Sequence, residues 1–417
     1  MSEFVRATPR PRAAHVALAA IGPGLLVMLA DADVGNVVTA AKAGAAFGFR
    51  LLPLLVVLVP VLYVIQELTL RVGILTHRGL GELVAERFGG GWSVIAGVAL
   101  VIAVLASLVT EFTGVAGIGE LYGVSRTIGV LLAGGMLLAI VVTGTYRRIE
   151  FLTLWIGLFQ LAFIAVAVTA RPDPHRVIHE MTHIPIGNHA FLFLAAAIIG
   201  ACFNPWMMFY QQSAVVDKGL RLRDLKVSRI ETAVGALIAQ LLTAAVLFAV
   251  ATSFGPSGSG GTLETVGAIS ESTKPLLGPT LGPLVFSVGV LGASMVAAVV
   301  CSLSLAWGIG ELCGVRRSLE REPQRLRWFF LIYVAGVVSA AALVLLSPNL
   351  IWLNIVAQVV NVFLLPVVMG LLIVLAARSL PARVSLRGWY LKLTVCIAVV
   401  TCGIGLLGAL LGMFGGS

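Results

Sequence analysis

Long runs of apolar residues, separated by short polar and basic segments, dominate the chain. The runs reach or exceed the roughly 20 residues that an α-helix needs to cross a bilayer. Membrane β-barrels would instead show alternating strands of about ten residues, and the continuous runs exclude them. The pattern predicts an all-α polytopic membrane protein with eleven transmembrane helices. The expected spans are residues 16–45, 51–75, 93–122, 126–145, 149–170, 190–216, 230–253, 279–312, 328–347, 350–377 and 390–414.

The composition narrows the class of protein further. Of the 417 residues, 59% are hydrophobic and 11% are charged, whereas soluble globular proteins carry about 25% charged residues. A soluble domain, a disordered chain and a disulfide scaffold are therefore excluded. All five cysteines lie in or at the ends of apolar runs, as expected for small buried side chains. Walker, HExxH and GxSxG motifs are absent, so we expect neither an enzyme nor an ATP-driven pump, and no cofactor.

The net charge of +9 comes from basic residues between the spans. That distribution follows the positive-inside rule and gives no support for nucleic-acid binding. If the N-terminus is cytoplasmic, 22 of the 28 lysines and arginines lie on the cytoplasmic side. The remaining six are Lys42, Arg50, Arg126, Arg171, Arg176 and Lys274. We therefore predict a multi-pass protein of the cell membrane, with a cytoplasmic N-terminus and, after eleven crossings, an extracytoplasmic C-terminus.

Two spans contain residues that interrupt a continuous helix. The first reads MLADADVGN from Met28 to Asn36, with two carboxylates, a glycine and an asparagine near mid-membrane. The sixth reads GACFNPW from Gly200 to Trp206, and its proline removes a backbone donor. The breaks lie five spans apart, so they occupy corresponding positions if spans one to five and six to ten form two halves. Paired breaks of this kind are typical of transporter sites near the membrane midplane.

The two halves give the expected domain organisation. It comprises a cytoplasmic tail, 1–15; a first repeat, 16–170; an extracytoplasmic loop, 171–189; a second repeat, 190–377; and a loop with the last span, 378–417. Four histidines cluster in the extracytoplasmic loop, and we favour solvated side chains over a metal-collecting group: His175, His179, His183 and His189. We expect Glu67, near the cytoplasmic end of the second span, to snorkel toward the membrane surface or to pair with Arg71.

The first break carries the strongest chemical signal. A charge at the centre of a span costs roughly 2.5–3.5 kcal/mol, and no Lys or Arg lies deep in a predicted span to pair with Asp31 or Asp33. A bound cation is therefore the expected partner. The candidate ligands are the carboxylates of Asp33 and Asp31, the amides of Asn36 and Asn204, and backbone oxygens near Ala30 and Ala201. Such an oxygen-only site suits Mg²⁺, Mn²⁺ or Ca²⁺ better than Cu⁺ or Zn²⁺.

Four stretches of the chain carry motifs that occur together in one transporter family. They are IGPGL at 21–25 with DVGN at 33–36, QELTLRVGI at 66–74, GACFNP at 200–205, and the segment from Gln358 to Pro366. Together they resemble the first, second, sixth and tenth spans of the Nramp divalent-metal transporters. The resemblance covers most of the chain. It implies a 5+5 inverted-repeat fold of the amino acid–polyamine–cation type, with broken first and sixth spans.

Departures from the family pattern bear on the chemistry. The metal-binding methionine of the family falls on Asn204, which replaces a soft thioether by a hard oxygen. Titratable positions that the family uses in proton movement fall on Trp206 and Leu108, although a family glutamate matches Glu111. Asn361 lies near the position of the tenth-span glutamine ligand. This pattern is similar to the Nramp-related magnesium transporter branch, whose members lack the methionine and the proton relay.

These features lead to one leading function and several alternatives. We expect transport of a divalent metal ion, Mg²⁺ or else Mn²⁺, by alternating access without obligatory proton coupling, with Glu111 and Asp31 as the remaining candidate proton carriers. The first alternative is a proton-coupled Mn²⁺/Fe²⁺ importer of the ordinary Nramp type. A sodium-coupled organic-solute transporter and a metal sensor without flux are further alternatives. The expected partners are the metal ion and the lipid bilayer, and we expect a monomer in the bacterial inner membrane.

Overall fold

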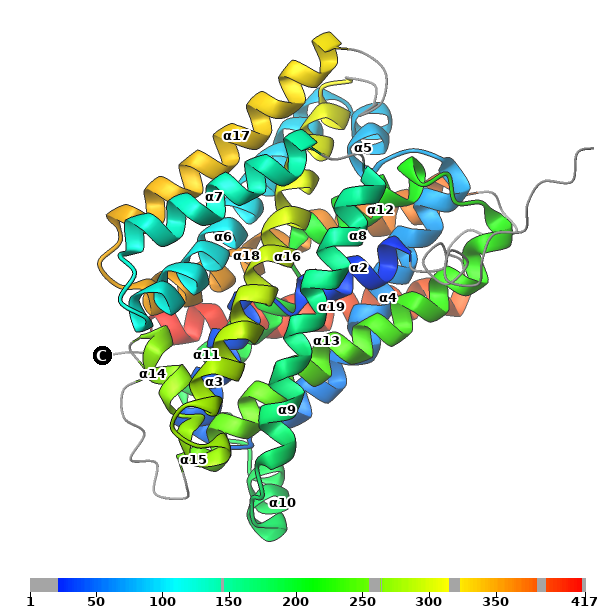
Figure 1. Ribbon diagram of the computed structural model, residues 1–417. Helices are drawn as coiled ribbons and strands as arrows, with labels where there is room; N and C mark the ends of the chain where they lie inside the picture. The colour runs from blue at the N-terminus through cyan, green and yellow to red at the C-terminus, as the bar shows by residue number, and fades with distance from the viewer. Residues whose placement is uncertain are drawn as a thin grey trace, which may run out of the picture.

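The structure, a computed structural model, describes residues 22–143, 146–254, 263, 265–314, 323–380 and 388–414. The N-terminal tail predicted for 1–15 lies outside these residues. The described part is helical and contains no strand (Figure 1). The α-helices are α2 (Pro23–Asp31), α3 (Val34–Phe47), α4 (Leu52–Thr76), α5 (Leu80–Phe88), α6 (Gly90–Leu121), α7 (Arg126–Thr143), α8 (Tyr146–Gly157), α9 (Ala162–Thr169), α10 (Pro174–Thr182), α11 (His189–Cys202), α12 (Pro205–Asp217), α13 (Leu225–Ser253), α14 (Val266–Glu271), α15 (Lys274–Leu277), α16 (Leu281–Leu312), α17 (Pro323–Leu346), α18 (Leu350–Ser379) and α19 (Gly388–Phe414).

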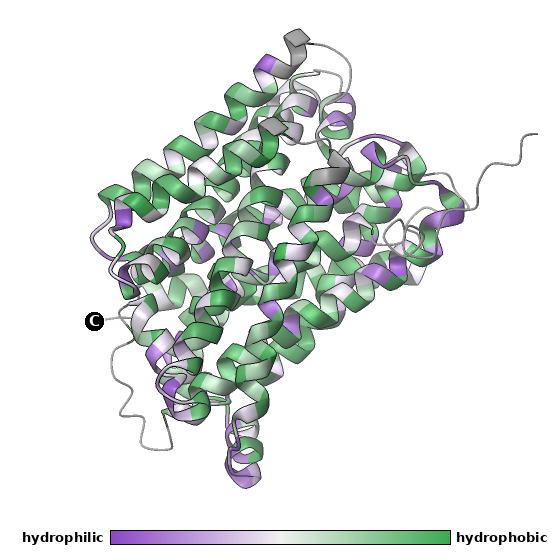
Figure 2. Ribbon diagram, viewed as in Figure 1, coloured by the Kyte–Doolittle hydropathy of each residue, from purple (hydrophilic) through white to green (hydrophobic). Residues whose placement is uncertain are grey.

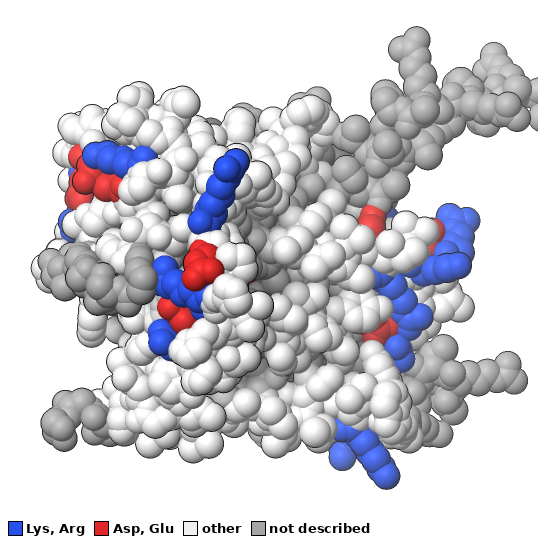
Figure 3. Space-filling model, turned by 90° about the horizontal axis from the view of Figure 1, so that it is seen from below, with Lys and Arg blue, Asp and Glu red and all other residues white. Residues whose placement is uncertain are grey.

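The predicted spans correspond to these helices. Among the described residues, nine helical segments are long and apolar enough to cross a membrane, and the bent pair α2–α3 makes a tenth. The remaining predicted span, 126–145, corresponds to α7, whose apolar stretch Arg126–Val141 is shorter. Most residues of the long helices are hydrophobic (Figure 2), and many large apolar side chains are exposed on the outside of the bundle. Charged side chains gather at opposite ends of the face in Figure 3, with an uncharged band between them, as expected for a surface surrounded by lipid.

Both predicted helix breaks are present. The chain bends by 43° between α2 and α3, and Asp33 begins the second helix by accepting a hydrogen bond from the backbone N–H of Asn36 at 2.7 Å. The α11–α12 break falls at Phe203 and Asn204, directly before Pro205. Proline is favoured at the first position of a helix because its missing donor would have no partner there. The local sequence therefore explains where each helix stops and restarts.

The broken helices lie inside a cage of continuous ones. Helix α13 packs against α2, α3 and α4, and α6 packs against α16, α17 and α18. Helix α12 contacts α16 and α4, while α11 lies between α18 and α19. Every residue from Val27 to Ala41 is buried. The two breaks are therefore shielded from both lipid and water by their neighbours.

The predicted polar loops differ from the structure because they contain short helices. Helices α10, α14 and α15 lie in the segments expected as loops, and α5 lies between the second and third spans. Helix α10 extends beyond the rest of the bundle at the bottom of Figure 1, and its residues are largely hydrophilic in Figure 2. These helices are too short to show the apolar periodicity by which a longer helix is recognised in a sequence.

Helix α10 is fastened to the end of α3 by Glu180. Its carboxylate accepts hydrogen bonds from the backbone N–H of Phe49 and from Arg176 Nε, both at 2.8 Å. Gly48 adopts a left-handed φ of +61°, and a Cβ there would collide with the same carboxylate. Burial raises the pKa of Glu180, but these hydrogen bonds and the charges of Arg176 and Arg50 outweigh it, so the pKa is lowered.

Candidate metal-binding site

Asn36 joins the two helix breaks to each other. Its Nδ2 atom donates a hydrogen bond to the backbone oxygen of Asp31 in the first break. The same atom donates to the backbone oxygen of Ala201 in the sixth span at 3.1 Å. Asp31 lies five positions from Asn36 along the chain, whereas Ala201 lies 165 positions away. The structure therefore brings together segments that the sequence could only place by symmetry.

Asp33 lies at this junction with half of its carboxylate engaged. It is completely buried, and its Oδ1 atom accepts hydrogen bonds from the backbone N–H of Asn36 at 2.7 Å and from Asn36 Nδ2 at 3.3 Å. Its Oδ2 atom has no hydrogen-bond partner among the described residues. One oxygen thus fixes the start of α3, and the other is left for a ligand.

Asn204 completes the site from the other break. Its Nδ2 atom donates to the backbone oxygen of Ala201 at 2.8 Å, while its Oδ1 atom accepts from Asn361 Nδ2 at 2.6 Å and from Ser107 Oγ at 3.2 Å. The carbonyl of Ala201 therefore receives amide donors from both Asn36 and Asn204. Because the oxygen and nitrogen of an amide have nearly the same shape, a half-turn of either side chain would present an oxygen instead.

The remaining candidate ligands lie in the last turn of α2. Ala30 and Asp31 are buried, with exposed fractions of 0% and 1%. Both carboxylate oxygens of Asp31 lack a hydrogen-bond partner among the described residues. The backbone oxygen that Asn36 reaches is that of Asp31, one residue beyond the predicted Ala30. The ligand roles of these residues stay predictions, but a buried carboxylate without partners calls for a cation or a proton.

Glu111 approaches the site from α6. It is completely buried, and its Oε2 atom accepts a hydrogen bond of 3.4 Å from the backbone N–H of Val34, the residue after Asp33. Its Oε1 atom accepts from Thr110 Oγ1 at 3.1 Å. This carboxylate therefore satisfies a free N–H in the first turn of α3. Glu111 is thus a structural neighbour of the first break as well as a candidate proton carrier.

Leu108 and Trp206, which the resemblance predicts to replace titratable groups, are both buried. Leu108 is a buried hydrocarbon side chain of α6. Trp206 is also buried, and its Nε1 atom donates to Ser107 Oγ at 2.7 Å. Since Ser107 in turn donates to Asn204, the indole positions the hydroxyl that contacts the candidate ligand. Neither side chain exchanges protons near neutral pH.

Gln358, which is not among the predicted ligands, lies between the two breaks. A Cβ at Gly35 would overlap Gln358 Nε2, and a Cβ at Gly200 would overlap the backbone oxygen of Gln358. Its Oε1 atom accepts from Asn361 Nδ2 at 3.2 Å. The signal that could have identified it is the spacing of Asn354, Gln358 and Asn361, which places three amides on one face of an apolar span.

The histidine cluster does not form a metal centre. No three His, Cys, Asp or Glu side chains are placed to hold one metal ion in the part of the chain that the structure describes. His175 and His179 lie on successive turns of α10, and the rings of His179 and His183 stack with their centroids 4.0 Å apart. His189 begins α11 and contacts the backbone oxygen of Leu411 through Nδ1 at 3.0 Å. The only oxygen-rich grouping built from both breaks among the described residues is therefore the one around Asp33.

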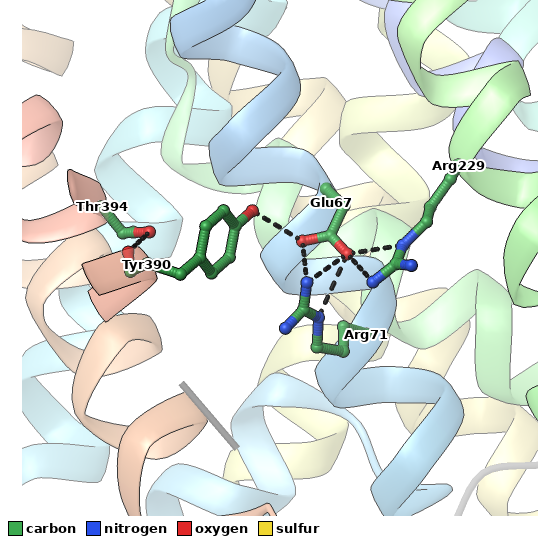
Figure 4. A network of polar contacts seen from close by, with 5 residues as sticks. All are labelled: Glu67, Arg71, Arg229, Tyr390 and Thr394. Atoms are coloured by element: carbon green, nitrogen blue, oxygen red, sulfur yellow. Dashed lines mark hydrogen bonds and ion pairs between the residues drawn. The ribbon is translucent and has the colours of Figure 1, made fainter. Parts of the chain in front are cut away.

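Glu67 is engaged in a separate polar cluster that links α4, α13 and α19 (Figure 4). Arg71 and Arg229 lie 2.8 and 2.6 Å from its Oε1 atom, and the Tyr390 hydroxyl donates to Oε2 at 3.1 Å. The Arg71 guanidinium also lies over the Tyr390 ring, 5.1 Å from its centroid. The predicted pairing of Glu67 with Arg71 is confirmed. With both oxygens occupied, this carboxylate is a structural link rather than a metal ligand.

Two discontinuous helices that meet at a buried carboxylate inside a helical bundle define the class of protein as a secondary membrane transporter. The chain belongs to the Nramp family, because residues 24–410 match the family described as natural resistance-associated macrophage protein-like. A relative in Bradyrhizobium diazoefficiens, named divalent metal cation transporter MntH, is 26% identical over 299 residues. That match covers 69% of this chain and 66% of the relative, so the chain spans just under two thirds of that protein.

Solved structures share the fold. The Eremococcus coleocola manganese transporter, in complex with an aromatic bis-isothiourea substituted compound, matches with a TM-score of 0.79 at 18% identity, covering 99% of this chain and 91% of that one. MhsT in complex with L-phenylalanine matches with a TM-score of 0.54 at 16% identity, covering 93% and 98%. The predicted fold class and the resemblance to the Nramp family are thereby confirmed. The division into repeats, the magnesium branch and the ligand set stay predictions.

Proposed function

We propose that this protein carries hard divalent cations across the membrane, Mg²⁺ first and Mn²⁺ second, by alternating access. The observation that carries the proposal is the free Oδ2 atom of Asp33 at the junction of two broken helices. Around it lie amide and backbone oxygens, with Asn204 at the position where the family has a thioether. Mg²⁺ and Mn²⁺ prefer oxygen ligands, whereas a thioether favours softer ions such as Cd²⁺.

The hydrogen bonds at Ala201 support a site that rearranges when it is loaded. Asn36 and Asn204 point their NH₂ groups at the same backbone oxygen. A cation bound to that oxygen would repel both donors, so each amide would turn and offer its own oxygen. Binding thus replaces two hydrogen bonds between the breaks by bonds to one ion, which couples ion binding to the relative position of α3 and α12.

We further propose that metal movement does not require proton movement. Leu108 and Trp206 occupy the positions of the family relay, and neither titrates near neutral pH. The second candidate function is a proton-coupled Mn²⁺/Fe²⁺ importer. It is supported by Glu111 and Asp31, which remain as buried carboxylates beside the first break, and by the similarity to proteins named divalent metal cation transporters.

Purified protein in proteoliposomes distinguishes these functions. Uptake of Mg²⁺, Mn²⁺ and Ca²⁺ would be measured with an internal metal indicator at several imposed pH gradients, with internal pH followed in parallel. The proposal expects Mg²⁺ and Mn²⁺ uptake that does not acidify the vesicles. Acidification in step with metal flux would establish the proton-coupled alternative, and no metal flux under any gradient would reject transport altogether.

The arrangement in the cell is part of the same proposal. The excess of basic residues on one side favours a cytoplasmic N-terminus and an extracytoplasmic C-terminus in a bacterial inner membrane. The central site is built within one chain, so a monomer suffices for transport, with the metal ion and the bilayer as its partners. Fusing a reporter active on only one side of the membrane to the C-terminus would test this orientation.

A further inference from the structure

Three buried amide side chains follow one face of α18. Asn354, Gln358 and Asn361 are spaced by four and three residues, and none has measurable exposure to solvent. Amides are costly inside a membrane helix unless other polar groups surround them, and such residues mark substrate pathways in transporters. Packing of α18 against its neighbours does not by itself explain the three amides on this face of the helix.

Two of these amides form a chain of contacts that starts at the metal site, and the third lies one turn farther along α18. Asn361 donates from Nδ2 to Asn204 at 2.6 Å and to Gln358 Oε1 at 3.2 Å. Farther along, Asn354 Nδ2 donates to Thr113 Oγ1 on α6 at 3.2 Å. The seam between α6 and α18 is thus polar from the junction of the breaks to Asn354.

Several polar atoms along this seam are unused. Asn354 Oδ1, Gln358 Nε2 and Asn361 Oδ1 have no hydrogen-bond partner among the described residues, although all three side chains are fully buried. Each such group normally has a partner, and its absence needs an explanation. A passing cation, or one of its waters, could contact the two free amide oxygens. A half-turn of the Gln358 amide would present a third oxygen to it.

The seam leads toward the Leu350 end of α18. From Asn361 to Asn354 the helix rises about 10 Å, and only four more residues, about 6 Å, separate Asn354 from Leu350. The distribution of basic residues predicts this end to be extracytoplasmic. The unused oxygens therefore bridge most of the distance between the site and one membrane surface.

Helix α14 packs on α6 near that end of the seam. Val266 packs so closely on α6 that a Cβ at Gly117 would lie 2.6 Å from the Val266 Cβ. Val266 and Ile269 are buried, with exposed fractions of 2% and 0%. Gly117 is one turn beyond Thr113 on α6, so apolar side chains of α14 cover α6 directly outside the Thr113–Asn354 contact.

We propose that Asn354, Gln358 and Asn361, with Thr113 opposite, form the path by which a divalent cation passes between the site and the Leu350 end of α18. The Thr113–Asn354 hydrogen bond is the constriction, and it must break for the ion to pass. The amide oxygens replace part of the water shell that the ion loses in the apolar bundle. This inference rests on the proposed transport function, and it adds residues that act on the rate of passage rather than on affinity.

Isosteric changes of threonine test the path. Thr113→Val removes the hydroxyl of the constriction. Thr394→Val makes the same change at a completely buried threonine of α19, whose hydroxyl donates to the Tyr390 backbone oxygen. The readouts are Mn²⁺ uptake into proteoliposomes and Mn²⁺ binding by calorimetry. We expect Thr113→Val and Asn354→Leu to slow uptake about ten-fold while changing the Kd by less than about two-fold, with Thr394→Val resembling the wild type.

The outcomes separate the path from the function. A wild type without uptake would reject the proposed function. If the wild type takes up Mn²⁺ and both Thr113→Val and Asn354→Leu take it up at the same rate, the proposed path is wrong. If Thr113→Val loses both Mn²⁺ uptake and Mn²⁺ binding, the proposed path is also wrong, because the hydroxyl would then belong to the binding site.

A cysteine probe gives a test that does not depend on slowed flux. Asn354→Cys would be exposed to a membrane-impermeant cationic methanethiosulfonate reagent on the extracytoplasmic side, with wild-type protein, which keeps its five cysteines, as the control. We expect uptake by the variant to be blocked and the wild type to be unaffected. Continued uptake after treatment of a variant that transports normally would place Asn354 away from the path and overturn the proposal.

Discussion

Asp33 has two roles that two substitutions can separate. Its Oδ1 atom caps α3 through the backbone N–H of Asn36 at 2.7 Å, while Oδ2 is free for an ion. Asp33→Asn keeps a side chain that caps helices well and removes the charge, whereas Asp33→Ala removes both. We expect both variants to lose metal binding, because the ion loses the carboxylate at the junction of the breaks.

The difference between the two variants measures the cap. Replacing an Asp or Asn cap by Ala costs about 1 kcal/mol. Since both variants lose the charge, Asp33→Ala should be less stable than Asp33→Asn by about that amount. In a chain of 417 residues, this corresponds to only about 1–2 °C in Tm, because the entropy of unfolding grows with chain length.

Two measurements on detergent-purified protein provide the test. Calorimetric titration with Mn²⁺ follows binding, and thermal unfolding without metal follows the cap. Wild-type affinity in Asp33→Asn would refute the assignment of Asp33 as the essential ligand, and equal Tm values in the two variants would refute the cap. Asp31→Ala is the comparison: it should weaken binding without abolishing it, and a larger effect there than at Asp33 would reverse the assignment.

Three further changes have defined outcomes. Asn204→Met should weaken Mg²⁺ transport and strengthen Cd²⁺ binding because a thioether is softer than an amide oxygen, and Asn204→Leu should lose Mg²⁺ without gaining Cd²⁺ in the same uptake and calorimetry assays. Gly200→Ala should lower the free energy of unfolding by about 1–3 kcal/mol in thermal unfolding, because its Cβ would overlap the backbone of Gln358. Gly134→Ala is the control and should not destabilise the protein, because its Cβ would meet Val337 at an ordinary 3.6 Å. Burial raises the pKa of Glu180, but its hydrogen bonds and the nearby arginines outweigh burial, so the net pKa is lowered. The ionised carboxylate therefore stabilises the fold above the pKa of a free glutamate, about 4.3, and this stabilisation is lost as the pH falls through the lowered value. The Tm of the wild type should fall more on acidification than the Tm of Glu180→Gln.

The spans could be predicted because crossing a bilayer is a local property of about 20 consecutive residues. Both breaks could be predicted for a similar reason. Asp33 with Asn36, and Asn204 before Pro205, carry helix-starting side chains at the positions where the new helices begin. Residue type and spacing therefore contain most of the information about where the helices of this fold begin and end.

The short helices could not be predicted, because contacts distant in sequence hold them. Helix α10 has nine residues, and its link to the bundle is a carboxylate that bonds Phe49, 131 positions away. Helix α14 has six residues and packs through Val266 against Gly117. Helices of this length are marginal in isolation, so tertiary packing rather than local propensity decides whether they form.

The chemistry of the site was predictable only in part, for the same physical reason. The carboxylates and amides near the breaks are visible as polar residues in apolar runs, but which amide contacts which carbonyl depends on how helices pack. In an environment without water, each buried amide must find a partner within the bundle, and its partner changes if an ion arrives. Asn36 and Asn204 both donate to the Ala201 carbonyl. An ion at that carbonyl must displace both, so the groups that recognise the ion are also the groups that hold the two broken helices together.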